Sequence, residues 1–404
     1  MPPQALSQTQ NQPSLDTSIL PRSPTFGSNA VLTAYQLVTR AEDHAVQLHR
    51  KIPANAKQAK AIAASNVLAA RVMGYLFIEM HRPRRSLGDV PITRLMTEVL
   101  SNSSHDAIYD MGKFYLNHFI RAFRTTNNTY PEPSNHPSRP SIDNLMDILM
   151  DTLEGSGKDH RSARANALIR DGYKCMLTGL YDETSCTKHP AVRELADQVE
   201  ASTGLIVTAH IFNEAVLQNI DPNDNFPHDA QRHHASAALS ILKMFGLVDL
   251  ADRLATIGNP ASATGVHALV NILSLNSLFH THFDALKLFL EPIEDGEDDE
   301  YDVYIAYPRI ARDGPSRIKF VSLPRQKGVD PDGTKYPLPD PRLLALHAVC
   351  ARVAHMSGAA EVLDEFDRDV KEMGVLAADG SSINTLNLML GQQDENPRHV
   401  SVKA

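Results

Sequence analysis

Apolar residues recur at three- to four-residue or heptad intervals from Asn29 onward, a period typical of amphipathic helices. Val31, Tyr35 and Val38 begin the pattern and would lie on one helical face. Further helices are expected at about residues 54–81, 90–100, 104–123 and 141–153. Pro83 should end the second of them, because proline restricts the residue before it. The pattern therefore predicts a helical N-terminal region over residues 29–155.

The two ends of the chain have a different composition. Residues 1–28 are rich in Pro, Ser and Gln and contain few large apolar groups. Such a segment buries too little surface to offset the entropy of ordering it, so a disordered tail is expected. Residues 341–378 are predicted to form a C-terminal helix or helix pair, and residues 379–404 a flexible tail.

Composition limits the classes of function. The formal net charge is −9, whereas a protein that holds nucleic acid by bulk charge is usually basic, so any such contact must come from local patches. Three cysteines cannot form a disulfide framework and indicate a reducing compartment. No uninterrupted apolar run approaches the roughly 18 residues that span a bilayer. A soluble intracellular protein without a membrane partner is expected, either nuclear or cytoplasmic.

The pattern changes after residue 156. The segments "KCML" and "GLIVTAHI" are apolar or β-branched runs bounded by glycine, as short strands should be, and "YDVYIAY" and "RIKFVSL" are similar. About 60 residues between His210 and Asn271 form an insertion, expected to be helical over about 214–268. The helix beginning near His280 is expected to continue through residues 285–290. The fold class is therefore α+β, mainly helical.

The segment "NILSLNSLFHTHFD" (271–284) places several polar side chains in apolar surroundings. His280 and Asp284 are four residues apart, so on a helix they share a face, which suits a metal ion or an intrahelical hydrogen bond. His282 would point away from that face. His210, in an apolar strand, suits either a catalytic group or a hydrogen-bonded core histidine.

Three segments, in this order, resemble the HNH (ββα-metal) endonuclease family, in the variant found in many fungal proteins. They are "CMLTG" at 175–179, "AHI" at 209–211, and an asparagine followed nine residues later by "HTHFD", at 271–284. The resemblance implies an HNH-like domain over 156–340, with a ββα-metal element embedded among flanking helices. Cys175 is expected to pack under its hairpin.

The family's chemistry assigns a role to each matching position. His210 would be the general base, and Asn271 would tie the connecting loop so that the strand histidine faces the helix. His280 and Asp284 would bind one divalent ion, and such mixed ligands suit Mg²⁺, Mn²⁺, Ni²⁺ or Zn²⁺. The implied function is metal-dependent hydrolysis of phosphodiester bonds in nucleic acid, with DNA as the expected partner.

Two departures from the family pattern favour an alternative function. Many members have Asp or His as a metal ligand immediately before the base, where this chain has Ala209. Asp221, Asp224 and His228 could supply a ligand, although no spacing rule selects them. The insertion is also long for the family and could cover the site. The alternative is a catalytically inactive, nuclease-derived scaffold or protein-binding module, and a purely helical interaction module would have no hairpin at all.

Overall fold

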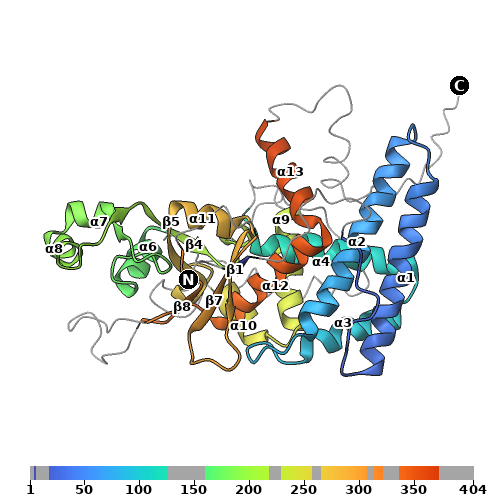
Figure 1. Cartoon of the computed structure of the whole chain (residues 1–404), viewed down its shortest axis with the longest axis horizontal. Helices are drawn as coiled ribbons and strands as arrows, with labels where there is room; N and C mark the ends of the chain where they lie inside the picture. The colour runs from blue at the N-terminus through green and yellow to red at the C-terminus, as the bar shows by residue number, and fades with distance from the viewer. Residues whose placement is uncertain are drawn as a thin grey trace, which may run out of the picture.

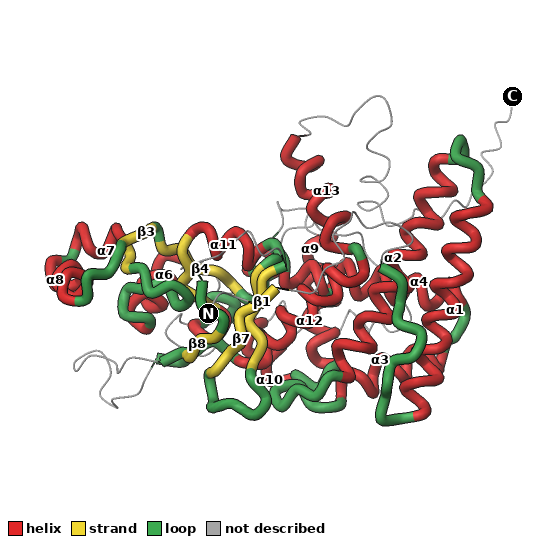
Figure 2. The backbone as a smooth tube through the Cα atoms, in the orientation of Figure 1, coloured by secondary structure: helices red, strands yellow, loops and turns green. Residues whose placement is uncertain are grey.

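The computed structural model describes residues 4–5, 18–125, 160–217, 229–256, 265–306, 314–321 and 336–372. Helices predominate and small sheets lie between them, so the predicted α+β, mainly helical class is confirmed (Figures 1 and 2). The α-helices are α1 (Asn29–Lys51), α2 (Lys57–His81), α3 (Val90–Ser101), α4 (His105–His118), α6 (His160–Arg170), α7 (Glu183–Lys188), α8 (Pro190–Gln198), α9 (Asp229–Met244), α10 (Val248–Ala255), α11 (Ser277–Asp284), α12 (Pro341–Ser357) and α13 (Ala359–Glu372). The short 3₁₀ helices are η1 (Ile120–Phe123), η2 (Glu214–Val216) and η3 (Leu269–Asn271). The strands are β1 (Gln4–Ala5), β2 (Tyr181–Asp182), β3 (Thr203–Gly204), β4 (Ile206–His210), β5 (Ile272–Asn276), β6 (Leu288–Pro292), β7 (Glu300–Ile305) and β8 (Arg317–Lys319).

Helices α1–α4 form the N-terminal bundle, as the apolar period predicts. The hydroxyl of Ser28 accepts a hydrogen bond from the Ala30 amide at 3.3 Å, and Ser104 caps α4 through the Ala107 amide at 3.2 Å. Each cap satisfies a backbone donor that the first helical turn leaves without a partner. Helix α2 ends before Pro83, as expected. The sequence 141–153 lies outside the described residues.

Helix α2 is long and apolar enough to cross a membrane, by length and composition alone. It contains no uninterrupted apolar run of that length, as expected, but its average hydropathy over 18 residues is high enough. The helix packs against α1, α4 and α12, and 61% of its most apolar 18-residue window is buried inside the protein. A helix buried to this extent in the protein interior packs as a core helix does. Helices α12 and α13 pass the same test only as a pair, and they are bent by 92°.

The structure differs from the expected disordered tail over part of residues 1–28. Leu20 is 1% exposed, and its backbone amide donates to the carboxylate of Glu42. Its side chain fills the space beside Gly74, where an added Cβ would lie 2.4 Å from the leucine methyl groups. Leu20 thus packs against α2 at Gly74 from an otherwise mainly polar segment, and this contact leaves no periodic signal in the sequence.

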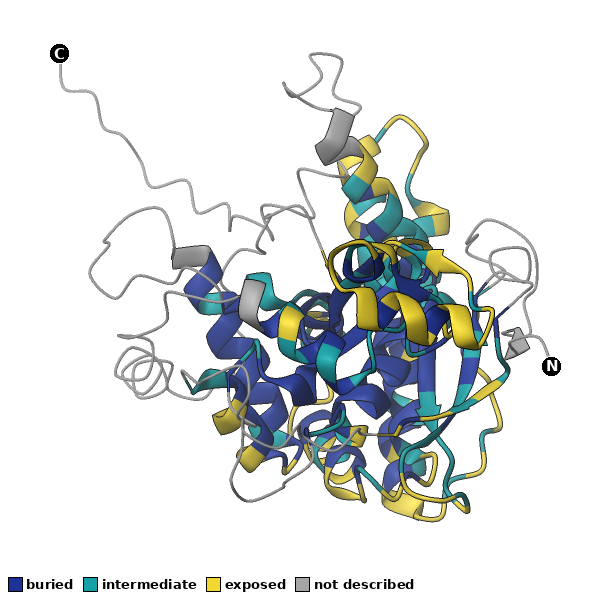
Figure 3. Cartoon of the chain, turned by 90° about the vertical axis from the view of Figure 1, so that its left-hand side faces the viewer, coloured by how far each residue is buried: buried dark blue, intermediate teal, exposed yellow. Residues whose placement is uncertain are grey.

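The main sheet pairs β6 with β7 in antiparallel fashion, and β8 and β1 pair with different parts of the opposite side of β7. Strands β4 and β5 form a separate antiparallel pair whose register places His210 opposite Ile272 and Ile206 opposite Asn276. Strands β2 and β3 form a short parallel pair. Figure 3, which looks at the left-hand side of Figure 1, shows exposed helical turns in front of a buried interior.

Helix α11 ends at Asp284, and the expected continuation through residues 285–290 is wrong. Leu286 has a φ of 58°, in the left-handed region that ends helices. The Lys287 amide donates to the His282 carbonyl at 2.8 Å, which closes the helix end. The apolar residues that follow belong to β6, which pairs with β7, so strand pairing overrides the helical appearance of the segment.

Ionic contacts join the bundle to the main sheet. Arg84 pairs with Glu79 at the end of α2 at 2.8 Å and with Glu291 on β6 at 2.9 Å. Arg352, on α12, also contacts Glu291. Within the basic segment "HRPRR" (81–85), Arg84 is thus buried and links α2 to β6.

Two histidines on α12, His347 buried and His355 partly buried, hold the end of α11, and they predict that acid destabilises the protein. Nε2 of His347 lies 3.2 Å from the Phe283 carbonyl, and Nε2 of His355 lies 3.0 Å from the Leu286 carbonyl. Burial lowers the pKa of His347 to about 3 and that of His355 to about 4. Below about pH 6.5 the unfolded chain therefore binds protons that the folded chain excludes. The free energy of unfolding should fall by about 1.4 kcal/mol per pH unit for each histidine.

Urea denaturation at pH 7, 6 and 5 measures this slope. The matched variant His347→Gln keeps a donor near the Phe283 carbonyl but does not titrate, so its slope should be smaller. An unchanged slope in His347→Gln would show that another group causes the acid dependence.

Candidate functional site

Strands β4 and β5 and helix α11 form a ββα unit. β4 pairs with β5, and β5 runs into α11 without an intervening loop. Oδ1 of Asn276 accepts a hydrogen bond from the Phe279 amide at 2.9 Å and so caps the helix. Helix α11 packs on β4 as well as on β5. This arrangement brings side chains from β4 and α11 to one place.

The turn at 175–179 supports the hairpin from beneath, as expected for Cys175. The thiol sulfur is buried and accepts from the Asn276 amide at 3.3 Å and from the Thr178 amide at 3.4 Å. The Met176 amide donates to the Ser274 carbonyl at 2.8 Å. Gly179 has a φ of 73°, which glycine adopts without strain, and closes the turn. The turn thus fixes β5 and the start of α11.

Asn271 ties the chain after His210 to the chain before β5. Its Oδ1 accepts from the Phe212 amide at 2.8 Å, and its Nδ2 donates to the carbonyls of Phe212 at 2.9 Å and Val266 at 2.8 Å. The side chain is fully buried, so both hydrogen bonds with Phe212 are shielded from water, and the one to Val266 is partly shielded. Asn271 therefore holds the chain after β4 against the chain before β5, and it does not line the cavity described below.

Arg170 is a second buried tie, which the sequence analysis missed. Its guanidinium is fully buried and donates to the carbonyls of Leu269 at 2.7 Å and Ile272 at 2.9 Å. Its charge is balanced by Asp171 at 2.6 Å. These bonds fix the chain on both sides of Asn271. The carbonyl partners of Arg170 are 99 and 102 residues away in the sequence, so no local sequence pattern predicts this role.

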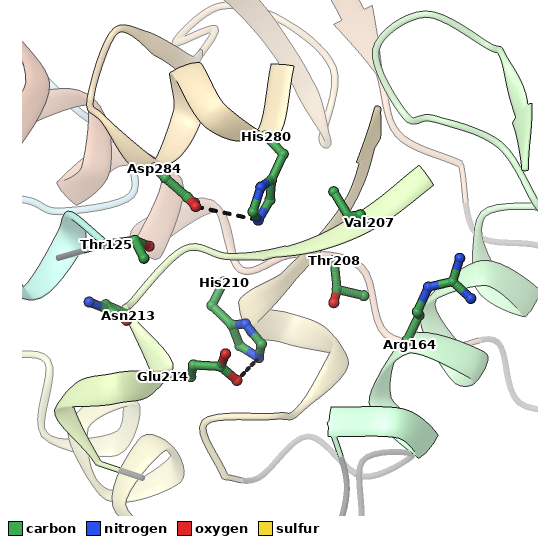
Figure 4. A pocket seen from close by; sticks show the side chains of 9 residues that line it. All are labelled: Thr125, Arg164, Val207, Thr208, His210, Asn213, Glu214, His280 and Asp284. Atoms are coloured by element: carbon green, nitrogen blue, oxygen red, sulfur yellow. Dashed lines mark ion pairs between the residues drawn. The ribbon is translucent and has the colours of Figure 1, made fainter. Parts of the chain in front are cut away.

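A cavity of about 270 Å³ opens between β4 and α11. Figure 4 shows His210 and the pair formed by His280 and Asp284 on opposite sides of it. The lining residues are Thr125, Arg164, Val207, Thr208, His210, Asn213, Glu214, His280 and Asp284. Within the described part of the chain, neither α9 nor α10 of the insertion contributes to this lining.

His280 and Asp284 share a face of α11, as predicted. Nε2 of His280 lies 3.4 Å from Oδ2 of Asp284. Two ligands that bind one ion at about 2.0–2.2 Å lie about 3.0–3.5 Å apart, so the pair fits one divalent ion. Burial raises the pKa of Asp284 to about 7, and a hydrogen bond from the Thr125 side chain opposes this shift. His282 is outside the cavity lining, as expected.

His210 lies in a cluster with two groups that the sequence analysis missed. Its Nε2 is 3.1 Å from Nδ1 of His267 and 3.5 Å from Oε2 of Glu214. The last two atoms are 3.4 Å apart. Glu214 follows His210 by four residues, but the strand ends between them, so no helical spacing could have identified the pair. His267 is 57 residues from His210.

Arg164 also lines the cavity, although its charge is paired with that of Asp182, and it was missed from the sequence. It extends from α6, and its guanidinium donates to the Ile206 carbonyl at 2.9 Å and to the carboxylate of Asp182 at 3.1 Å. Its side chain is 31% exposed, so the head group retains access to the cavity. A guanidinium of this kind can bind phosphate oxygens.

The predicted site residues thus divide into two groups. His210, His280 and Asp284 meet at one cavity, while Asn271 supports it from the interior. Asp221, Asp224 and His228 lie outside the described residues. No family model, curated protein or solved structure significantly matches the chain. What this site does must therefore be argued from its geometry and chemistry.

Proposed function

We propose that the protein is a metal-dependent endonuclease of the HNH type, which hydrolyses phosphodiester bonds of DNA. The observation that carries the proposal is that His210 from β4 and the His280–Asp284 pair from α11 line one cavity. The order of these groups along the chain, with Asn271 between them, is that of the family described above. The ββα unit is then the ββα-metal element of the enzyme.

His210 is the general base in this proposal. Its Nε2 faces Glu214, and the edge of the ring that carries Nδ1 is turned toward the side of the cavity with His280 and Asp284 (Figure 4). A proton on Nε2 suits Nδ1 of His267, the hydrogen-bond partner at 3.1 Å, and the nearby carboxylate of Glu214, and it leaves Nδ1 of His210 as the acceptor. Nδ1 takes a proton from the attacking water, the water oxygen bonds to phosphorus, and the bond to the leaving oxygen breaks. The leaving oxygen takes up a proton from solvent.

His280 and Asp284 would hold the divalent ion. When bound, the ion supplies charge that stabilises the phosphate and the leaving oxygen. Arg164 orients another phosphate oxygen from the α6 side of the cavity. Together these groups offset the negative charge of the substrate locally, as a chain with a net charge of −9 requires. A nuclear or cytoplasmic location is part of the proposal, in keeping with three cysteines that are buried and form no disulfide.

Cleavage of supercoiled plasmid by the purified protein tests the proposal. Nicking is expected with Mg²⁺, Mn²⁺ or Ni²⁺ and should stop when a chelator removes the metal. His280→Ala should need at least tenfold more metal for half-maximal nicking, because one of two protein ligands is lost. His282→Ala, two residues away and outside the cavity, is the matched control and should behave as wild type.

One observation favours the scaffold alternative. Ala209 occupies the position where many members of the family have a further ligand, and it is fully buried in β4. A folded protein that nicks plasmid with none of these metals, and whose His280 site binds no Mn²⁺ in calorimetry, would establish that alternative.

A further inference from the structure

We infer that His210, Glu214 and His267 form a second metal site, separate from His280 and Asp284, which takes Zn²⁺. Two imidazoles and one carboxylate are ligands that Zn²⁺ commonly binds. They come from three places, namely the end of β4, the start of η2 and the chain just before η3. Among the described residues, these are the three metal-ligating side chains whose donor atoms all approach one another closely.

The spacing of the three donor atoms fits a tetrahedral ion. Nε2 of His210, Nδ1 of His267 and Oε2 of Glu214 form a nearly equilateral triangle with sides of 3.1, 3.5 and 3.4 Å. Ligands about 2.0–2.1 Å from a tetrahedral ion are about 3.3 Å apart. The circle through the three atoms has a radius of about 1.9 Å, so such an ion would lie about 0.7 Å out of their plane. In an ideal tetrahedral site the ion also lies about 0.7 Å from the plane of any three of its ligands.

The surroundings also suit a metal. The side chain of His210 is 6% exposed, that of His267 22% and that of Glu214 26%, so the cluster is partly shielded but can be reached from solvent. Asn271 binds the Val266 carbonyl and the backbone of Phe212, and so it holds the segments next to both histidines. Water can complete the fourth position from the cavity side.

Metal bound here would switch off the base, a consequence that rests on the proposed function. A metal on Nε2 of His210 leaves the ring's proton on Nδ1, the atom that must accept a proton from water. The same histidine would therefore be a base when Nε2 carries its proton toward His267 and inert when Nε2 binds an ion. Zn²⁺ would inhibit cleavage that Mg²⁺ supports.

Calorimetric titration with Zn²⁺ of the metal-free full chain tests the site without any reference to activity. Glu214→Gln and His267→Gln should each weaken Zn²⁺ binding at least tenfold, because one of three ligands is lost. His280→Ala should leave the affinity of this site within twofold of wild type. Affinities of Glu214→Gln and His267→Gln within twofold of wild type, in variants with an unchanged circular dichroism spectrum, would overturn the site. So would loss of binding in His280→Ala alone.

Zn²⁺ absorption edge spectroscopy of the one-to-one complex gives a readout independent of affinity. Four nitrogen and oxygen neighbours at about 2.0–2.1 Å are expected, and six water-like neighbours would contradict the site.

The inhibitory role needs a separate measurement. Each protein's Mg²⁺-supported nicking is compared with and without Zn²⁺ at a concentration that saturates wild type. At least a tenfold loss is expected in wild type and a smaller loss in His267→Gln. Unchanged cleavage at saturation, or cleavage supported by Zn²⁺ alone, would overturn inhibition. Absence of cleavage with every metal would count against the proposed function, while the titration would still decide the site.

Discussion

His210→Ala should lower the rate of metal-supported plasmid nicking by about 10²–10⁴-fold, the usual contribution of a general base. The imidazole is the proposed proton acceptor of the cavity, and alanine offers none. The change should leave the protein folded, because the His210 ring lies at the cavity and the buried ties of the ββα unit come from other side chains. Initial rates of nicking, measured at saturating Mg²⁺ or Mn²⁺, give the effect.

Two controls make the result specific. His282→Ala removes a nearby histidine outside the cavity and should nick within twofold of wild type. The affinity of the His280–Asp284 site for Mg²⁺ should match that of wild type in His210→Ala, because both of its ligands are retained. If His210→Ala nicks at more than a tenth of the wild-type rate, His210 is not the base.

Asn271→Ala should lower the free energy of unfolding by about 3–5 kcal/mol. The substitution removes three hydrogen bonds and leaves the Phe212 amide and the carbonyls of Phe212 and Val266 without this partner in a buried place. A buried polar group without a partner costs about 1–3 kcal/mol. Urea denaturation followed by circular dichroism measures the change.

Asn276→Ala is the matched control from the same segment. The side chain of Asn276 accepts one hydrogen bond, as the cap of α11, and its loss should cost about 1 kcal/mol. A smaller loss in Asn271→Ala than in Asn276→Ala would contradict the role of Asn271 as a tie. A stable Asn271→Ala protein with slow nicking would instead place its effect at the cavity.

Much of the ββα unit could be predicted from the sequence, because its signals are local. The four-residue spacing of His280 and Asp284 puts both on one face of any helix that contains them. Apolar runs bounded by glycine indicated β4, and three ordered motifs indicated which strand and helix belong together. The end of α11 was missed because the apolar residues after Asp284 suit a strand as well as a helix, and only pairing with β7 selects the strand.

The sequence by itself determined the helical period of the bundle, the serine caps of α1 and α4 and the shared face of His280 and Asp284. These depend on backbone geometry within a few residues. Only the tertiary structure decided that Leu20 packs beside Gly74, that Arg170 ties the chain around Asn271 and that Glu214 and His267 meet His210. The two histidines are 57 residues apart, and whether they meet depends on how the intervening chain folds back against the rest of the protein. The periodicity of apolar residues reflects only neighbours within a few positions, so it does not predict such contacts.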